Sequence, residues 1–320
     1  MKKVILITLA IILLVSILTG CGAETKETYI SIATGGPAGT YYPLGGALAK
    51  IFNDNIEGVN ANVQSTGASV ENVGLIAKGE AEIAFVQNDI TYYAITGTEN
   101  FEGKEKVGNL RGMAMLYPEV VQVIATEDSG IKTIGDLRGK RVAIGAPGSG
   151  VEANARQILA IHGMTYDDLG KADYLSFNEA AEQLKNKQID AAFITAGIPT
   201  SAVTEVAQTT KIVVVSIESG KIDELNKDYP FYTEVVIPAN TYGGQNSDIT
   251  TAAVMAMLVV PEDLDEDLVY KLTKQMFENR QVIIDTHSRG NDISLETALK
   301  GMPIELHPGA KKYYDEMGVK

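Results

Sequence analysis

The stretch that decides the fold class is YISIATGGPAGTYYPLGGALAK, residues 29–50. Its start, Tyr29–Thr34, has the alternation of a strand, and the apolar spacing over Leu44–Asn55 is that of a helix. A glycine-rich turn joins the two. Outward from here the pattern predicts further elements at Asn62–Ser65 (strand), Val70–Lys78 (helix) and Ala81–Val86 (strand). This βαβα order predicts a mainly parallel sheet flanked by helices.

A second α/β series follows later in the chain. Its elements are predicted at Arg141–Ile144 (strand), Glu152–His162 (helix), Asp190–Thr195 (strand), Pro199–Ala207 (helix) and Lys211–Val215 (strand). The length of the chain suits two lobes with separate cores. We therefore predict an α/β fold in which residues 28–120 plus 251–320 form lobe 1 and residues 121–250 form lobe 2.

Two segments are expected to connect the lobes. The long apolar run Leu110–Thr126 is predicted to cross from lobe 1 to lobe 2, and a return crossing is predicted near Tyr242–Met257, with a buried strand over Ala252–Val260. Helices predicted at Asp265–Asn279, Leu295–Lys300 and Pro308–Met317 then pack back on lobe 1.

The amino terminus has the features of an export signal. Lys2 and Lys3 precede an apolar run, Val4–Leu18, and Leu18-Thr19-Gly20-Cys21 has the form of a bacterial lipobox. We predict a signal peptide over residues 1–20, lipidation of Cys21, and a polar tether over residues 21–27. The protein would then lie outside the cytoplasm, held to the membrane by acyl chains. The alternative is an uncleaved anchor helix with an incidental cysteine.

Composition excludes several classes of function. The net charge of −14 argues against nucleic acid as a partner, because phosphate binding needs a basic surface. Cys21 is the only cysteine, and the three histidines lack metal-ligand spacing. The chain also has no P-loop ending and no Gly-x-Ser-x-Gly elbow. We therefore predict no metal, no cofactor and no enzymatic activity.

Four predicted strand-to-helix turns carry glycine or small polar residues: Gly35–Thr40, Thr66–Ser69, Gln87–Asp89 and Pro147–Gly150. Such turns lie at the carboxyl ends of strands, where ligands of α/β sheets bind. Free amides at helix starts favour carboxylate or phosphate groups. Two lobes that each present such turns would form a clamp for a small anion. The alternative for any single turn is ordinary helix capping, as by Thr40 or Ser69.

These fragments together resemble one family. Gly35–Leu48, Thr66–Asn72 and Ala84–Asp89 are similar to the TAXI family of solute-binding proteins of TRAP transporters. The similarity continues over Asp136–Val142, Gly145–Gly150, Asp190–Phe193, Thr241–Gln245, Gly301–Ile304 and Leu306–Ala310. It implies a periplasmic-binding-protein type II fold with two hinge crossings, a TRAP membrane permease as partner, and glutamate or a C5 dicarboxylate such as 2-oxoglutarate as ligand.

The resemblance also implies site residues. They are Gly39, Thr40, Tyr41, Gly67, Ala68, Ser69, Gln87 and Asp89 in lobe 1, Gly148, Ser149, Gly150, Val151, Thr195, Gly197 and Pro199 in lobe 2, and Tyr242 and Gln245 near the hinge. Asp89 would pair with the ammonium of an amino acid or, alternatively, point to solvent as a helix-start acid. Many relatives have threonine at the position of Val151, which leaves the choice of ligand open.

The prediction is therefore a lipid-anchored, non-enzymatic solute receptor. One alternative is a protein of the same fold whose partner is an ABC permease or a sensor kinase. Two further alternatives are a surface-anchored α/β enzyme and an adhesin or structural lipoprotein.

Overall fold

The computed structural model describes residues 27–320. The predicted signal peptide, the lipidation site Cys21 and nearly all of the predicted tether lie outside the described residues. Within residues 27–320, no helix has both the length and the apolar character needed to cross a membrane.

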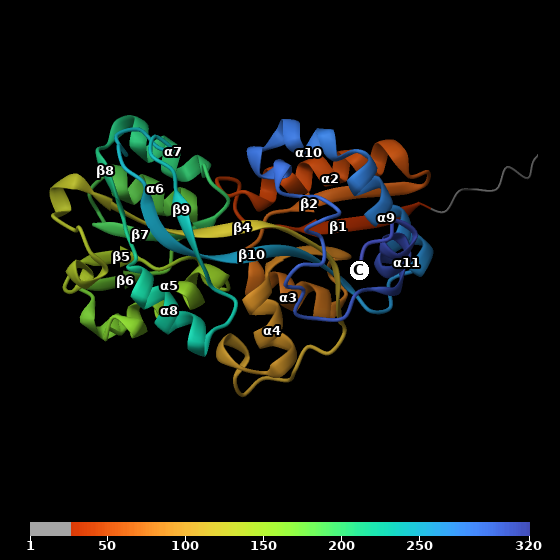
Figure 1. Cartoon of the computed structure of the whole chain (residues 1–320), viewed down its shortest axis with the longest axis horizontal. Helices are drawn as coiled ribbons and strands as arrows, with labels where there is room; N and C mark the ends of the chain where they lie inside the picture. The colour runs from red at the N-terminus through yellow and green to blue at the C-terminus, as the bar shows by residue number, and fades with distance from the viewer. Residues whose placement is uncertain (1–26) are drawn as a thin grey trace, which may run out of the picture.

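The first lobe is built from parallel strands covered by helices on both faces (Figure 1). Its elements are β1 (Thr28–Ala33), α2 (Tyr41–Asn55), β2 (Val59–Gln64), α3 (Ser69–Lys78), β3 (Ile83–Gln87) and α4 (Asn88–Thr96). β1 pairs in parallel with both β2 and β3. Gly45 lets α2 lie close to the end of β1, since a Cβ there would come within 2.5 Å of Thr34 Cγ2. The predicted βαβα order is confirmed.

Two long antiparallel strands run through both lobes. They are β4 (Leu110–Thr126) and β10 (Ile249–Pro261), which cross the middle of the molecule in Figure 1. The pairing is irregular between Met255 and Met257, opposite Pro118, which cannot donate a ladder hydrogen bond. The predicted crossing over 110–126 is confirmed. The return crossing begins later than predicted, because Tyr242–Gln245 forms a turn in which Gly244 has a φ of +83°.

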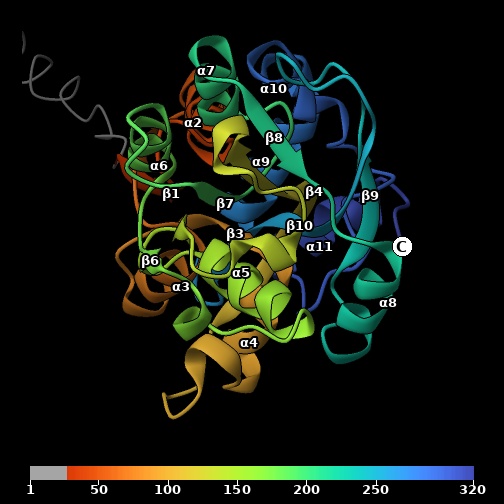
Figure 2. The same cartoon turned by 90° about the vertical axis from the view of Figure 1, so that its left-hand side faces the viewer.

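The second lobe surrounds the carboxyl half of β4. Its elements are β5 (Arg141–Ala143), α5 (Gly150–Ile161), β6 (Lys171–Asp173), α6 (Phe177–Lys185), β7 (Ala191–Ala196), α7 (Ser201–Thr209), β8 (Ile212–Val215), α8 (Ser219–Asp228) and β9 (Thr233–Ile237). β6, β5 and β7 are parallel, whereas β7 and β8 pair antiparallel with β4 and β9 with β10. Figure 2 shows α6 and α7 on one side of this sheet and α5 on the other.

The carboxyl-terminal segment returns to lobe 1, as predicted. It contains α9 (Glu266–Glu278), α10 (Arg280–Thr286) and α11 (Pro308–Glu316), of which α9 and α10 pack against α2. The helix predicted over Leu295–Lys300 is wrong: these residues form successive turns, in which Ala298 donates to the Ser294 carbonyl and Lys300 to the Thr297 carbonyl.

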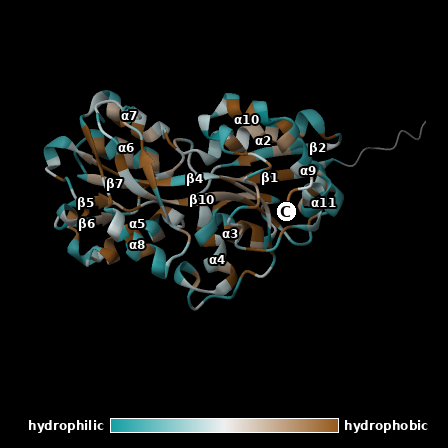
Figure 3. Ribbon diagram, in the orientation of Figure 1, coloured by the Kyte–Doolittle hydropathy of each residue, from teal (hydrophilic) through white to brown (hydrophobic). Residues whose placement is uncertain are grey.

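The central strands consist mostly of hydrophobic residues, whereas hydrophilic residues are frequent in the outer helices and loops (Figure 3). One core, from Ile30 to Tyr314, lies between the lobe 1 sheet and α2, α9 and α11. A second core, from Val121 to Val254, lies between the lobe 2 sheet and α5 and α8. Burying a large apolar side chain stabilises the fold by about 1.5–3 kcal/mol. The two cores therefore make each lobe a rigid body on which a site can be held.

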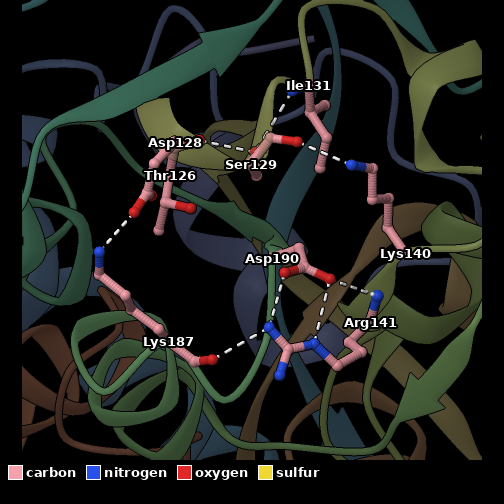
Figure 4. A network of polar contacts seen from close by, with 8 residues as sticks. All are labelled: Thr126, Asp128, Ser129, Ile131, Lys140, Arg141, Lys187 and Asp190. Atoms are coloured by element: carbon pink, nitrogen blue, oxygen red, sulfur yellow. Dashed lines mark hydrogen bonds and ion pairs between the residues drawn. The ribbon is translucent and has the colours of Figure 1, made fainter.

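The edge of lobe 2 that faces away from lobe 1 is fixed by a polar network (Figure 4). The carboxylate of Asp190 accepts hydrogen bonds from the Arg141 backbone N–H at 2.8 Å and from its Nη2 at 2.7 Å. Arg141 also donates to the Lys187 carbonyl, and Lys187 forms an ion pair with Asp128. These contacts join the start of β7 to the start of β5.

Candidate ligand-binding site

A cavity of about 60 Å³ lies between the two lobes, at the carboxyl ends of their parallel strands. That is room for about four to six water molecules, which suits a small solute. We call it the interlobe cavity. It is lined by Gly35, Gly36, Gly39, Thr40, Tyr41, Thr66, Gly67, Ala68, Ser69, Gln87 and Glu119, and by Ala146, Ser149, Gly150, Val151, Ser176, Phe177, Thr195 and Ala196.

The starts of four helices, α2, α3, α5 and α6, meet at this cavity. The first amides of a helix have no partner within the helix and carry partial positive charge. In α5, Ser149 accepts from the Glu152 N–H, and this cap leaves the amides of Gly150 and Val151 outside the helical ladder. At α2 the Thr40 side chain does not cap its own helix and donates instead to the Gly197 carbonyl of lobe 2, at 3.3 Å.

The start of α3 is capped across the lobe boundary. The Val70 and Glu71 N–H groups both donate to the carbonyl of Gly148, at 3.0 and 3.1 Å. Ala68, the residue just before α3, has a φ of +80°. This conformation is strained for any residue that has a Cβ atom, and such strained residues concentrate at functional sites. The loop of lobe 2 is therefore held directly against the ligand-facing turn of lobe 1.

Two polar atoms on buried side chains that line the cavity have no hydrogen-bond partner among the described residues. They are Gln87 Oε1 and Thr195 Oγ1, on side chains that are at least 96% buried. Each such atom costs about 1–3 kcal/mol when it is left unsatisfied. Gln87 and Thr195 line the cavity from opposite lobes. A bound polar solute is the natural partner for these atoms.

The cavity also contains a buried carboxyl group, that of Glu119 on β4. Its side chain is 3% exposed, and Oε2 accepts a hydrogen bond of 2.8 Å from the Tyr41 hydroxyl. Burial raises the pKa of Glu119 to about 8, although the Tyr41 hydrogen bond acts in the opposite direction. Burial and the charge of Glu119 also raise the pKa values of Tyr41 and Tyr117. None of the described residues that line the cavity is a lysine, arginine or histidine.

Most of the predicted site residues line the cavity. They are Gly39, Thr40, Tyr41, Gly67, Ala68, Ser69 and Gln87 from lobe 1 and Ser149, Gly150, Val151 and Thr195 from lobe 2. The remaining predicted residues do not line it: Asp89, Gly148, Gly197, Pro199, Tyr242 and Gln245.

Asp89 is fully buried, so it does not point to solvent, and it does not line the cavity. Its Oδ2 accepts a hydrogen bond of 3.1 Å from Asn154 of lobe 2, and burial raises its pKa to about 7. Asn154 also accepts from Gln87 Nε2 at 3.2 Å and donates to the Tyr232 hydroxyl at 2.7 Å. Asp89 thus belongs to a buried network that connects the two lobes.

The other residues that lie off the cavity support its walls. The carbonyl groups of Gly148 and Gly197 form the contacts between lobes described above, and Pro199 follows Gly197 in the same loop. The Tyr242 hydroxyl accepts from the Thr200 N–H at 2.9 Å and donates to Gln122. Gln245 donates to the carbonyl groups of its own turn, such as that of Ser247 at 2.9 Å.

The residue-based predictions missed Glu119, Ser176 and Phe177. Glu119 carried a usable signal, because it is the one acidic residue in the apolar run 110–126. A buried charge without a paired cation is rare unless it serves a function. Ser176 caps α6 and Phe177 is its first residue; the sequence pattern did not predict this helix, so the approach of Phe177 to Gly39 was not foreseeable. Within residues 27–320, no group of three acidic, histidine or cysteine side chains could hold a metal ion.

Comparison with known proteins gives the following likenesses. Residues 32–318 match the model of the NMT1-like family. A protein from Bordetella bronchiseptica RB50 is similar in structure with a TM-score of 0.55 and 18% identity, over 91% of this chain and 83% of that one. PhnD1 from Prochlorococcus marinus (MIT 9301), in complex with methylphosphonate, has a TM-score of 0.55 and 10% identity, over 93% and 100% of the two chains.

A Listeria monocytogenes protein provisionally named as an L-cystine ABC transporter has a TM-score of 0.51 and 17% identity, over 83% of this chain and 98% of that one. At these identities the likenesses establish the fold, which is the periplasmic-binding-protein type II fold.

Proposed function

Because this chain belongs to the NMT1-like family and has the periplasmic-binding-protein type II fold, we propose that it is an extracytoplasmic solute receptor of a membrane transporter. It binds a small carboxylate between its lobes, releases it to a permease and carries out no chemical reaction. The observation that carries this proposal is the interlobe cavity, where unpaired polar atoms of both lobes face the same small space.

The geometry supports binding by closure. A solute in the cavity contacts Gln87 of lobe 1 and Thr195 of lobe 2 at the same time only when the lobes are together. Its affinity for the closed form then exceeds its affinity for the open form, so binding shifts the population toward closure. The strands β4 and β10, which connect the lobes, are the segments about which they would move.

Glutamate and C5 dicarboxylates such as 2-oxoglutarate are the first candidate ligands. The resemblance to the TAXI family favours them, and the convergence of four helix starts on one cavity suits a carboxylate. The likeness to a protein in complex with methylphosphonate points to the same kind of site, one that holds a small anion.

We propose a TRAP-type permease as the partner and a lipid on Cys21 as the anchor. The motifs shared with the TAXI family favour the TRAP assignment, whereas one of the similar structures carries an ABC transporter name. Reconstitution with the cognate membrane subunits in vesicles separates the two. Uptake driven by an ion gradient without ATP supports TRAP, and uptake that requires ATP supports ABC.

The test of the receptor function is a binding screen. The chain from residue 22 onward, freed of carried-over solute by unfolding and refolding, is titrated with amino acids and with C4–C6 mono- and dicarboxylates. A solute at 100 times its Kd adds about 2.7 kcal/mol to the free energy of unfolding, which is easily seen as a raised Tm. A selective rise supports the receptor function. Chemical turnover of a bound solute would favour an enzyme, and no response to any solute an adhesin.

A further inference from the structure

The interlobe cavity combines groups that attract negative charge with a carboxyl group. The helix starts at Tyr41, Ser69 and Gly150 carry the partial positive charge of their first amides, which attracts negative charge. The carboxyl group of Glu119 lines the same cavity, and no described lysine, arginine or histidine forms an ion pair with it. A solute that carried only negative charge would leave this carboxyl group without a counter-charge.

The surroundings of Glu119 provide hydrogen bonds but no cation. Tyr41 from α2 donates to it, and hydrogen bonding by Gln87 of β3 and by Tyr117, two residues earlier on the same strand, also acts to lower its pKa. Asp89, at the start of α4, adds negative charge nearby. The charge of Arg289 acts on Tyr117, but its Nη1 forms an ion pair with Asp292 at 3.0 Å, and its Nε has no partner among the described residues.

We propose that Glu119 binds the ammonium group of the solute, so that the ligand is an amino acid whose carboxylate meets the helix starts. This inference rests on the proposed receptor function and narrows its ligand class to zwitterions. An ammonium group supplies the missing counter-charge and donates to acceptors that line the cavity, among them the unpaired Gln87 Oε1. Glutamate is then preferred to 2-oxoglutarate or glutarate.

The proposal has a proton signature. With a pKa of about 8, Glu119 holds a proton in most ligand-free molecules at pH 7, and an ammonium group beside it would drive that proton off. Binding of an amino acid then releases up to one proton per ligand, and affinity falls as the pH is lowered. The competing arrangement, a protonated Glu119 that donates to a ligand carboxylate, predicts no release and an affinity that rises at low pH.

The experiment is isothermal titration calorimetry of ligand-free protein with matched pairs, each an amino acid and its deaminated acid, such as glutamate and glutarate. Titrations in two buffers with different ionisation heats give the number of protons released. We expect the amino acid to bind about 30-fold or more tightly than its deaminated partner, because truncating one member of a buried charge pair has about this effect. Glu119→Gln should abolish both the preference and the proton release. The exposed Glu182→Gln on α6 is the matched control and should retain both.

Two results would overturn the inference while the receptor function stands. One is a deaminated acid that binds the wild type as tightly as its amino acid, and the other is a folded Glu119→Gln variant that keeps the preference and the proton release. If Glu119→Gln does not fold, the wild-type preference and the sign of the proton release decide. If the wild type binds no member of any pair, the proposed function fails, and the inference fails with it.

Discussion

The ladder between β4 and β7 has a carboxyl group at each end, and the two are treated in opposite ways. At the outer end, Asp190 accepts three hydrogen bonds from Arg141, and these bonds lower its pKa. At the cavity end, Glu119 accepts from Tyr41 and has no ion-pair partner among the described residues, and burial raises its pKa to about 8. The carboxylate at the outer end has its partners within the protein, whereas Gln87 Oε1 and Thr195 Oγ1 at the cavity end have none among the described residues. This difference supports the proposal that the cavity end is the binding edge.

The largest expected effect is on the pH dependence of stability. The folded protein raises the pKa of Glu119 to about 8 and of Asp89 to about 7, so it holds more protons than the unfolded chain between pH 5 and 7. The free energy of unfolding of the ligand-free protein should therefore fall as the pH rises, by about 1.4 kcal/mol per pH unit for each group. Urea unfolding at pH 5, 6 and 7 measures this slope.

The variant Glu119→Gln should remove its own share of that slope. Asp190 behaves differently, because its lowered pKa confines its titration to pH values below its ordinary 3.8. Its stabilising contribution is present above that value and is lost only as the pH falls further. A slope between pH 5 and 7 that Glu119→Gln does not change would contradict the contrast between the two ends.

The outer end should be the more sensitive to substitution. In Asp190→Asn, two Arg141 donors face a neutral amide instead of a carboxylate. Because both side chains are partly exposed, we expect a loss of about 1–2 kcal/mol in the free energy of unfolding. Solute affinity should be unchanged, because the network lies at the opposite end of β7. Asp315→Asn, in an exposed i,i+4 pair of α11, is the control and should change stability by less than about 0.5 kcal/mol. Weaker solute binding by folded Asp190→Asn would show that the two ends are coupled.

The same contrast explains what could be predicted from the sequence. The βαβα order and the crossing strand follow from local patterns, and β4 has the predicted bounds. The sequence pattern did not predict Glu119 as a site residue, because its proposed role depends on Tyr41, which lies 78 residues away in the chain. Asp89 follows a strand, as a site residue would, but tertiary packing turns its carboxylate toward Asn154. Composition near a turn indicates where a ligand could bind, whereas the direction of each side chain is set by long-range contacts.

Closure at the cavity end should be sensitive to a single methyl group. A Cβ at Gly150 would lie 1.8 Å from Gln87 Oε1 and 3.0 Å from Ile90 Cγ1, both in lobe 1. Gly150→Ala should therefore disfavour the arrangement in which the lobes meet, by about 1–3 kcal/mol, and weaken solute binding about 5- to 150-fold. Calorimetric titration measures this. Gly46→Ala, where an added Cβ meets nothing within 4 Å, should bind normally. Unchanged affinity in Gly150→Ala would mean that Gln87 moves aside freely.

The smallest effect tests the cavity end most directly, because it has opposite signs with and without solute. Thr195→Val replaces a buried hydroxyl group that lacks a partner with a methyl group of similar size. The ligand-free protein should gain about 1 kcal/mol in the free energy of unfolding, since the desolvation cost of the hydroxyl disappears. The complex should lose a hydrogen bond of similar value, so the two effects add to about 2 kcal/mol and affinity falls about 30-fold. Asp190→Asn should show the reverse pattern, with lower stability and unchanged affinity. If Thr195→Val destabilises the ligand-free protein, its hydroxyl group already has a partner, such as a bound water, and the cavity end is less open to solute than the contrast requires.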